Sequence, residues 1–190
     1  MTNGRVFPID RKITVLTLIL AAFSPAAAAQ KFLKLPSVEI FGGYSYLHFQ
    51  STTLGFSKQL NMSGAIAGIS IPIYAGLGIS GDASAHYSGA LEAYYFMAGP
   101  QYRLQWRALR LTGHGLFGKG RSRLRNPGTT FNEPSTIARA WAVGGELDVP
   151  LRERMWLRPL EADYVTTSAF GSTLHNLRIS SGLIFIFGKH

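Results

Sequence analysis

The chain closes on a segment in which bulky apolar residues occupy every second position. On one parity lie Leu177, Ile179, Leu183, Phe185 and Phe187, and opposite them lie Asn176, Arg178, Ser180 and Gly182. Successive residues of a β-strand point to opposite faces, so the first set forms one surface of a strand. That surface is more apolar than a soluble protein normally shows to water. The pattern predicts a strand, because its period is two rather than the 3.6 of a helix.

The N-terminus has the pattern of an export signal. Basic Arg5, Arg11 and Lys12 precede an apolar stretch at 13–23, and Ala27-Ala28-Ala29 offers a small-x-small cleavage site. The apolar stretch is shorter than the ~20 residues of a membrane-spanning helix. We therefore predict a signal peptide at residues 1–29 and one domain at residues 30–190. No later segment has a long apolar run, so if this domain spans a membrane, only a closed barrel satisfies its backbone.

Eight alternating segments follow the leader, each about as long as a tilted membrane strand. They are predicted near Val38–His48, Asn61–Ile71, Gly76–His86, Glu92–Arg103, Ala108–Gly118, Ala138–Val149, Trp156–Thr166 and Asn176–Phe187. Longer polar connections, at Phe49–Leu60, Tyr87–Leu91, Lys119–Ile137 and Thr167–His175, alternate with short ones. This alternation is typical of an all-β, eight-stranded antiparallel up-and-down transmembrane β-barrel, with short turns in the periplasm and loops outside.

The parity of the charges favours a membrane barrel over a soluble ligand-binding barrel, which turns its apolar residues inward. Ten ionisable residues fall on the side opposite the bulky apolar set: Glu39, Asp82, Arg103, Arg110, His114, Glu146, Asp148, Glu161, Asp163 and Arg178. We expect them to line a small polar lumen. Aromatic residues near strand ends are expected to form interfacial girdles, namely Tyr44, Tyr46, Trp106, Trp141, Trp156 and Tyr164.

Two prolines interrupt the predicted strands. Pro100 and Pro159 lack the N–H that a closed ladder uses. Gly99-Pro100 predicts a bulge near the periplasmic rim. A second bulge at Pro159 would explain why Arg158 and Glu161 differ in parity.

Five short motifs, taken in order, carry a family resemblance. They are Glu39-x-x-x-Gly43-Tyr44-Ser45-Tyr46, Gly99-Pro100-Gln101-Tyr102-Arg103, Gly144-Gly145-Glu146-Leu147-Asp148-Val149, Arg158-Pro159-Leu160-Glu161-Ala162-Asp163-Tyr164 and His175-Asn176-Leu177-Arg178. Together they resemble the bacterial outer-membrane β-barrels related to the transmembrane domain of outer membrane protein A. The resemblance covers roughly Val38 to Gly188 and implies fold and outer-membrane location, but no single activity. It also implies that Gly182, Phe185 and Phe187 belong to a C-terminal assembly signal read by the barrel-assembly machinery. Gly188-Lys189-His190 departs from the pattern, because the final aromatic residue usually ends such chains.

The lumen charges suggest two roles. An eight-stranded barrel is only wide enough for side chains to fill it, so the charges must meet one another. They form either a structural salt-bridge plug, which we expect, or an ion path. Asp82-x-Ser84-x-His86 resembles a catalytic triad, but i and i+2 neighbours lie ~6.6 Å apart along a strand. We therefore expect no catalytic site, although partners on adjacent strands could complete one for a lipid substrate.

The histidines are dispersed and the chain has no cysteine, so we expect neither a metal site nor a cofactor. The formal charge is +9. For an exported chain without a phosphate loop or recognition helix, this charge favours anionic lipid over nucleic acid.

A row of cations opens the third long connection. Lys119, Arg121, Arg123 and Arg125 occupy every second position, and Arg139 follows the far end of the connection. They predict contact with lipopolysaccharide phosphates, whereas the simpler alternative is a solvated basic strand extension. The expected function is that of a monomeric, non-enzymatic outer-membrane protein whose plugged barrel serves structure or surface interaction, by lipopolysaccharide contact or adhesion. A narrow small-solute channel is the first alternative, and a lipid-modifying enzyme the second.

Overall fold

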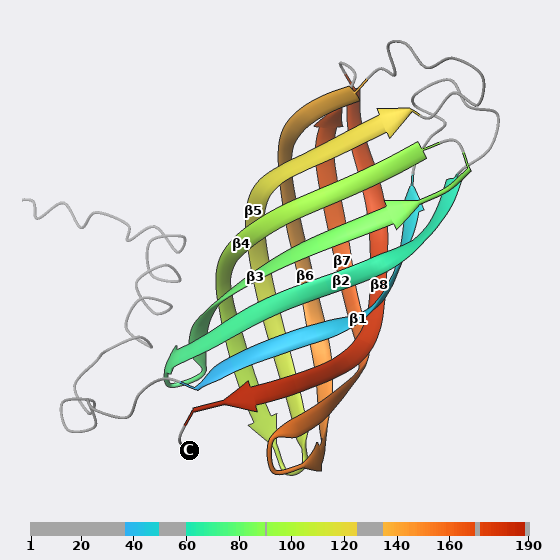
Figure 1. Ribbon diagram of the computed structural model, residues 1–190. Helices are drawn as coiled ribbons and strands as arrows, with labels where there is room; N and C mark the ends of the chain where they lie inside the picture. The colour runs from blue at the N-terminus through green and yellow to red at the C-terminus, as the bar shows by residue number, and fades with distance from the viewer. Residues whose placement is uncertain (1–36, 50–59, 90, 125–134, 170–171, 189–190) are drawn as a thin grey trace, which may run out of the picture. The chain divides into compact units, whose positions relative to one another are not determined.

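The computed structural model describes residues 37–49, 60–89, 91–124, 135–169 and 172–188, which form one closed antiparallel barrel (Figure 1). Each strand pairs with the next in sequence, and the last pairs with the first from Val38↔Phe187 to His48↔Leu177. The strands are β1 (Val38–Phe49), β2 (Leu60–Tyr74), β3 (Leu77–Tyr87), β4 (Leu91–Trp106), β5 (Leu109–Leu124), β6 (Ser135–Arg152), β7 (Met155–Ala169) and β8 (Ser172–Phe187). The predicted fold is confirmed. No helix in the described residues is long and apolar enough to cross a membrane.

Three two-residue turns mark one end of the barrel, called here the turn end. They lie between β2 and β3, β4 and β5, and β6 and β7, and β8 also finishes at this end, where the Ile186 amide donates to the Arg154 carbonyl (Figure 1). Ala75 and Gly76 both have positive φ, the conformation of the tight turns that match strand twist. We call the opposite end the loop end.

Strands at the loop end run further than predicted. Thr167–His175 was expected to be a connection, but β7 reaches Ala169 and β8 begins at Ser172. The reason lies in packing, because Leu174 in this stretch points into the barrel and is fully buried. Likewise β5 reaches Leu124 and β6 begins at Ser135, so both ends of the predicted connection Lys119–Ile137 are strand, and residues 125–134 lie outside the described residues.

The two faces of the wall differ as the parity predicts. Large apolar side chains cover the outside: Phe96 is 66% exposed, Phe117 67% and Trp106 65%. Charged groups such as Arg178 and Asp163 lie inside and are fully buried. An outer wall of this kind suits hydrocarbon rather than water.

Only one of the two predicted proline irregularities is a bulge. Around Pro159 the register shifts, because Arg158 pairs with Gly182 whereas Glu161 pairs with Ser180. This extra residue turns Arg158 and Glu161 to the same inner face. The bulge predicted at Pro100 is wrong: the register stays constant from Ala98↔Phe117 to Gln101↔His114, with two ladder pairs missing between them. Pro100 lies on the exposed outer face, and the missing N–H interrupts the ladder without adding a residue.

The lumen is not polar throughout. In its loop half, side chains from several strands form an apolar cluster, which contains Leu47, Phe49, Met62, Leu91, Ala93, Tyr95, Met97, Leu116, Ala140, Ala142, Val165 and Leu174. A smaller cluster of Phe41, Ile66, Ile184 and Ile186 packs in the turn half. Trp156 was predicted to join an outer girdle, and this is wrong. Trp156 lies on the N-terminal side of the bulge, on the same face as Arg158, and packs against the smaller cluster, with the Arg110 guanidinium 4.4 Å from its ring centre.

Candidate functional site

The charged residues of the lumen form one connected network, which begins at Glu39 on β1. The Arg103 Nη2 atom lies 2.6 Å from Glu39 Oε2, and Arg110 Nη1 lies 3.0 Å from Glu39 Oε1. Arg110 continues to Asp148 on β6, with Nη2 and Oδ2 2.9 Å apart. Two arginines from neighbouring strands β4 and β5 therefore share one carboxylate from β1, across the barrel interior.

Arg158 joins three carboxylates and is the main site residue that sequence reasoning missed. Its Nε lies 2.8 Å from Asp148, its Nη2 2.5 Å from Glu146 and its Nη1 3.0 Å from Glu161. Strict alternation places Arg158 outside the barrel, and only the bulge brings it inside. The signal in the sequence was the parity conflict between Arg158 and Glu161 on either side of Pro159.

Arg178 on β8 anchors the other side of the network and is 0% exposed. Its Nη2 lies 2.5 Å from Asp82 and 2.6 Å from Asp163, and its Nη1 donates to Ser84 Oγ at 3.1 Å. One guanidinium thus ties β8 to β3 and β7, with multiple charge-assisted hydrogen bonds.

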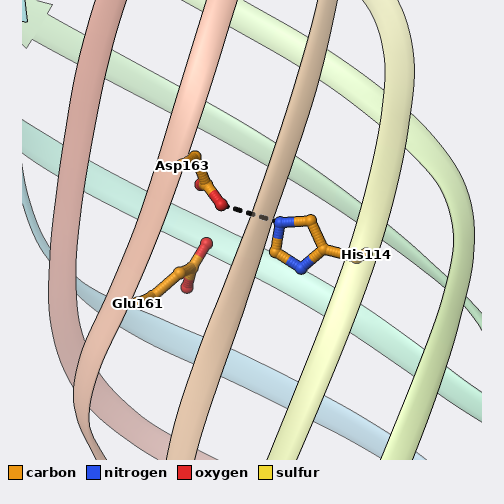
Figure 2. A group of neighbouring side chains, drawn as sticks. All are labelled: His114, Glu161 and Asp163. Atoms are coloured by element: carbon orange, nitrogen blue, oxygen red, sulfur yellow. Dashed lines mark hydrogen bonds and ion pairs between the residues drawn. The ribbon is translucent and has the colours of Figure 1, made fainter.

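His114 on β5 closes the network between two acids. Its Nε2 lies 2.7 Å from Asp163 Oδ1 (Figure 2). Its Nδ1 lies 3.0 Å from Glu146 Oε1. Ionised carboxylates only accept hydrogen bonds, so this geometry is that of an imidazolium donating from both nitrogens. All ten predicted lumen residues lie within the connected set, and Arg158 makes the eleventh member.

The triad-like motif does not assemble as a nucleophile and base. Ser84 Oγ receives a hydrogen bond from Arg178, and Asp82 is ion-paired with the same guanidinium. His86 Nε2 lies 2.9 Å from Ser45 Oγ on β1 instead. The three residues line the lumen, but Asp82 and Ser84 both contact Arg178, whereas His86 contacts Ser45.

Three ligand-type side chains do come together at His114, Glu161 and Asp163, whose potential ligand atoms lie within 4.8 Å of one another (Figure 2). Inspection of the histidines alone missed this group, because both carboxylates come from β7 and the imidazole from β5. Asp163 already accepts hydrogen bonds from His114 and Arg178, while Glu161 accepts one from Arg158. A metal ion here would face two guanidinium groups and displace an imidazole proton, so the arrangement suits an ion-pair network better.

The predicted phosphate-contact residues lie on the outer wall near the loop end. Lys119, Arg121 and Arg123 project outward from β5, and Arg139 on β6 is directly opposite Lys119 in the ladder. Arg123 is opposite Glu92. Arg125 lies outside the described residues. In the part of the chain that the structure describes, no carboxylate lies within ion-pair distance of Lys119, Arg121 or Arg139.

Known protein families and curated sequences give no match to this chain. Several solved structures match its fold. Neisserial surface protein A matches with a TM-score of 0.62 at 9% identity, over 80% of this chain and 97% of that one. Ail, the attachment invasion locus protein of Yersinia pestis, solved in complex with the heparin analogue sucrose octasulfate, matches with a TM-score of 0.53 at 16% identity. The match covers 79% of this chain and 99% of that one. The N-terminal β-barrel domain of Pseudomonas aeruginosa OprF matches at 0.51 and 10% identity over 82% and 100%.

The chain has the fold of the eight-stranded outer-membrane barrels. The resemblance drawn from its motifs is therefore confirmed at the level of the fold. An outer-membrane barrel of this kind has its first and last strands paired, and the residues assigned to the assembly signal lie at that seam. Phe185 and Phe187 face outward, whereas Gly182 faces Gly43 across the β1–β8 ladder. A Cβ on Gly182 would lie 2.2 Å from the Gly42 carbonyl oxygen, so the close approach of the two strands excludes larger residues.

Proposed function

We propose that this protein is a non-enzymatic, monomeric outer-membrane barrel with a sealed lumen, which serves envelope structure and surface interaction by binding lipopolysaccharide on its outer wall. In this proposal the barrel-assembly machinery inserts it after signal-peptide cleavage. The observation that carries the proposal is the division of charge: the lumen charges are ion-paired with one another, whereas Lys119, Arg121 and Arg139 face outward.

The filled lumen favours this function over a solute channel. A cavity lined by Ser70, Ser80, Asp82 and Glu161 has a volume of about 20 Å³, which holds about one water molecule. Beyond it, the apolar cluster of the loop half occupies the remaining cross-section with side chains such as Leu47, Tyr95 and Leu116.

The outward cations supply what a phosphorylated lipid needs. Lys119 and Arg139 are directly opposite each other, and like charges at such positions destabilise a sheet unless an anion compensates them. They adjoin large lipid-facing side chains: Phe117 and Trp141, directly opposite each other, lie on the same face two residues nearer the turn end. Cations at the boundary between hydrocarbon and water are well placed for headgroup phosphates.

The experiment compares lipopolysaccharide retained per barrel after purification of the full chain from outer membranes in mild detergent. The test variant replaces Lys119, Arg121 and Arg139 with Gln. Each cation near an anionic surface contributes about 1 kcal/mol, so affinity should fall on the order of a hundredfold. The matched control replaces Arg107, Arg152 and Arg154, three exposed arginines at the turn end, and should retain lipopolysaccharide as the unmodified protein does. Equal retention by the test variant would refute the proposed contact.

A further inference from the structure

A hollow lies on the outer wall across β2, β3 and β4, on the side toward the outward cations. Two adjoining depressions, of about 520 and 270 Å³, share Ala67, Ala83 and Phe96. Their combined size falls in the range of small-molecule sites. The wall here points small side chains outward where neighbouring strands carry aromatic ones, so the surface is recessed rather than convex.

The ladder register defines the shape of this groove. Its floor consists of two cross-strand pairs, Ala65↔Ala85 and Ala67↔Ala83. Phe96, directly opposite Ala83 on β4, forms one wall. Tyr44, directly opposite Ala65 on β1 and 55% exposed, stands on the other side. These flanking residues are three strand spacings apart, or about 14 Å, which leaves room between the rings for extended hydrocarbon chains.

The cations adjoin the loop end of the same groove. Lys119 is directly opposite Phe96, and Arg121 is directly opposite Tyr94, which lines the smaller depression. Arg139 follows on the next strand, opposite Lys119. An apolar groove thus ends where a cluster of outward cations begins, which is the division between acyl chains and phosphates in a membrane lipid.

We propose that this groove seats acyl chains of lipid A, the phosphorylated and multiply acylated glycolipid of lipopolysaccharide, while Lys119, Arg121 and Arg139 hold its phosphate. The inference rests on the proposed function and adds where the hydrocarbon binds. A second copy of the chain is a poorer occupant. A two-fold interface centred on the groove would bring the two apolar floors together and leave the adjoining Lys119, Arg121 and Arg139 without a compensating anion.

The experiment measures binding by native mass spectrometry of the full chain in detergent, with two probes. One is acylated lipid A, and the other is the same phosphorylated disaccharide without acyl chains. The unmodified protein should bind acylated lipid A more tightly than the stripped disaccharide. Ala83→Phe fills the groove floor and should weaken the binding of acylated lipid A about tenfold, equivalent to 1.4 kcal/mol, while leaving the binding of the disaccharide unchanged. Lys119→Gln combined with Arg139→Gln should weaken the binding of both probes.

Ala162→Phe is the matched control. Ala162 also faces outward, but on β7, where it is opposite Gly145 and Ile179 on the far side of the barrel from β3. It should bind both probes as the unmodified protein does. Heat-modifiable migration on cold and boiled gels checks that each variant is folded. Ala67→Leu, a smaller change in the same floor, replaces Ala83→Phe if that variant does not assemble.

The outcomes separate the two proposals. If the unmodified protein binds neither probe, the proposed lipopolysaccharide contact fails. If the unmodified protein binds lipid A and the cation variant binds it more weakly, but Ala83→Phe binds it equally well, the lipopolysaccharide contact stands and the groove inference is wrong. Phosphatidylglycerol binding as tightly as lipid A, or loss of a dimer in Ala83→Phe with lipid binding intact, would also contradict it.

Discussion

Replacement of Arg178 by alanine tests whether the lumen network holds the barrel together. The guanidinium is fully buried and bridges Asp82 on β3 and Asp163 on β7, at 2.5 and 2.6 Å. Its removal leaves Asp82 without a cation and Asp163 with only His114, and the cavity beside Asp82 admits little water. Breaking a buried ion pair from one side typically costs about 3–5 kcal/mol, because the remaining charge is uncompensated.

The measurement is equilibrium unfolding by urea in detergent, followed by heat-modifiable migration and tryptophan fluorescence. Arg178→Ala should lose about 3–5 kcal/mol of unfolding free energy. Arg121→Ala, which removes an exposed arginine from the outer wall, should change it by no more than about 0.5 kcal/mol. Asp82→Asn combined with Arg178→Ala should recover part of the loss, since the carboxylate left without a cation is then neutral.

Planar-bilayer recording completes this test. The apolar cluster of the loop half is untouched by the substitution, so Arg178→Ala should be destabilised without conducting. A loss of stability below about 1 kcal/mol, or stable current steps from the variant, would refute the reasoning that the network is a structural plug.

Two further changes test packing. Gly182→Ala should destabilise the β1–β8 seam by about 1–3 kcal/mol, because its Cβ would meet the Gly42 carbonyl oxygen at 2.2 Å. Gly42→Ala, where a Cβ meets nothing within 4 Å, should leave stability unchanged. Equal folded fractions of the two variants on cold gels would contradict this account. Tyr95→Ala should cost about 3–5 kcal/mol by leaving a cavity in the loop-half cluster. Its lipid-facing neighbour Phe96→Ala should cost clearly less in the same urea titration, and the reverse order would show that the faces are misassigned.

The sequence predicted correctly those inward and outward faces that depend only on the two-residue period of a strand. At 146–149 in β6 and at 176–180 in β8, charged or polar residues alternate with bulky apolar ones, so the faces of Glu146, Asp148 and Arg178 follow directly. The bulge at Pro159 was predicted from the conflict between Arg158 and Glu161, and the register confirms it. The prediction failed for the residues on the N-terminal side of the bulge, because the change of phase that turns Arg158 and Trp156 inward was not carried through to their faces.

The apolar filling of the loop half was also missed, for a different reason. In β1 and β4, apolar residues occupy both parities: Leu47 faces inward and Tyr44 outward, and Tyr95 faces inward beside Phe96. Alternation cannot assign such strands, because either face suits hydrocarbon or a packed interior. Only closure of the barrel, which brings these side chains together in a narrow lumen, distinguishes the two environments.

A cysteine scan along β6 tests the central claim most directly, since the chain has no native cysteine to remove. Single cysteines from Ala140 to Val149, labelled with a nitroxide in reconstituted bilayers, report accessibility to oxygen dissolved in the lipid. We predict maxima at Trp141, Val143, Leu147 and Val149, and minima at Ala142, Glu146 and Asp148. Maxima on the charged positions, or no alternation along the strand, would contradict a barrel with hydrocarbon outside and its ion pairs enclosed.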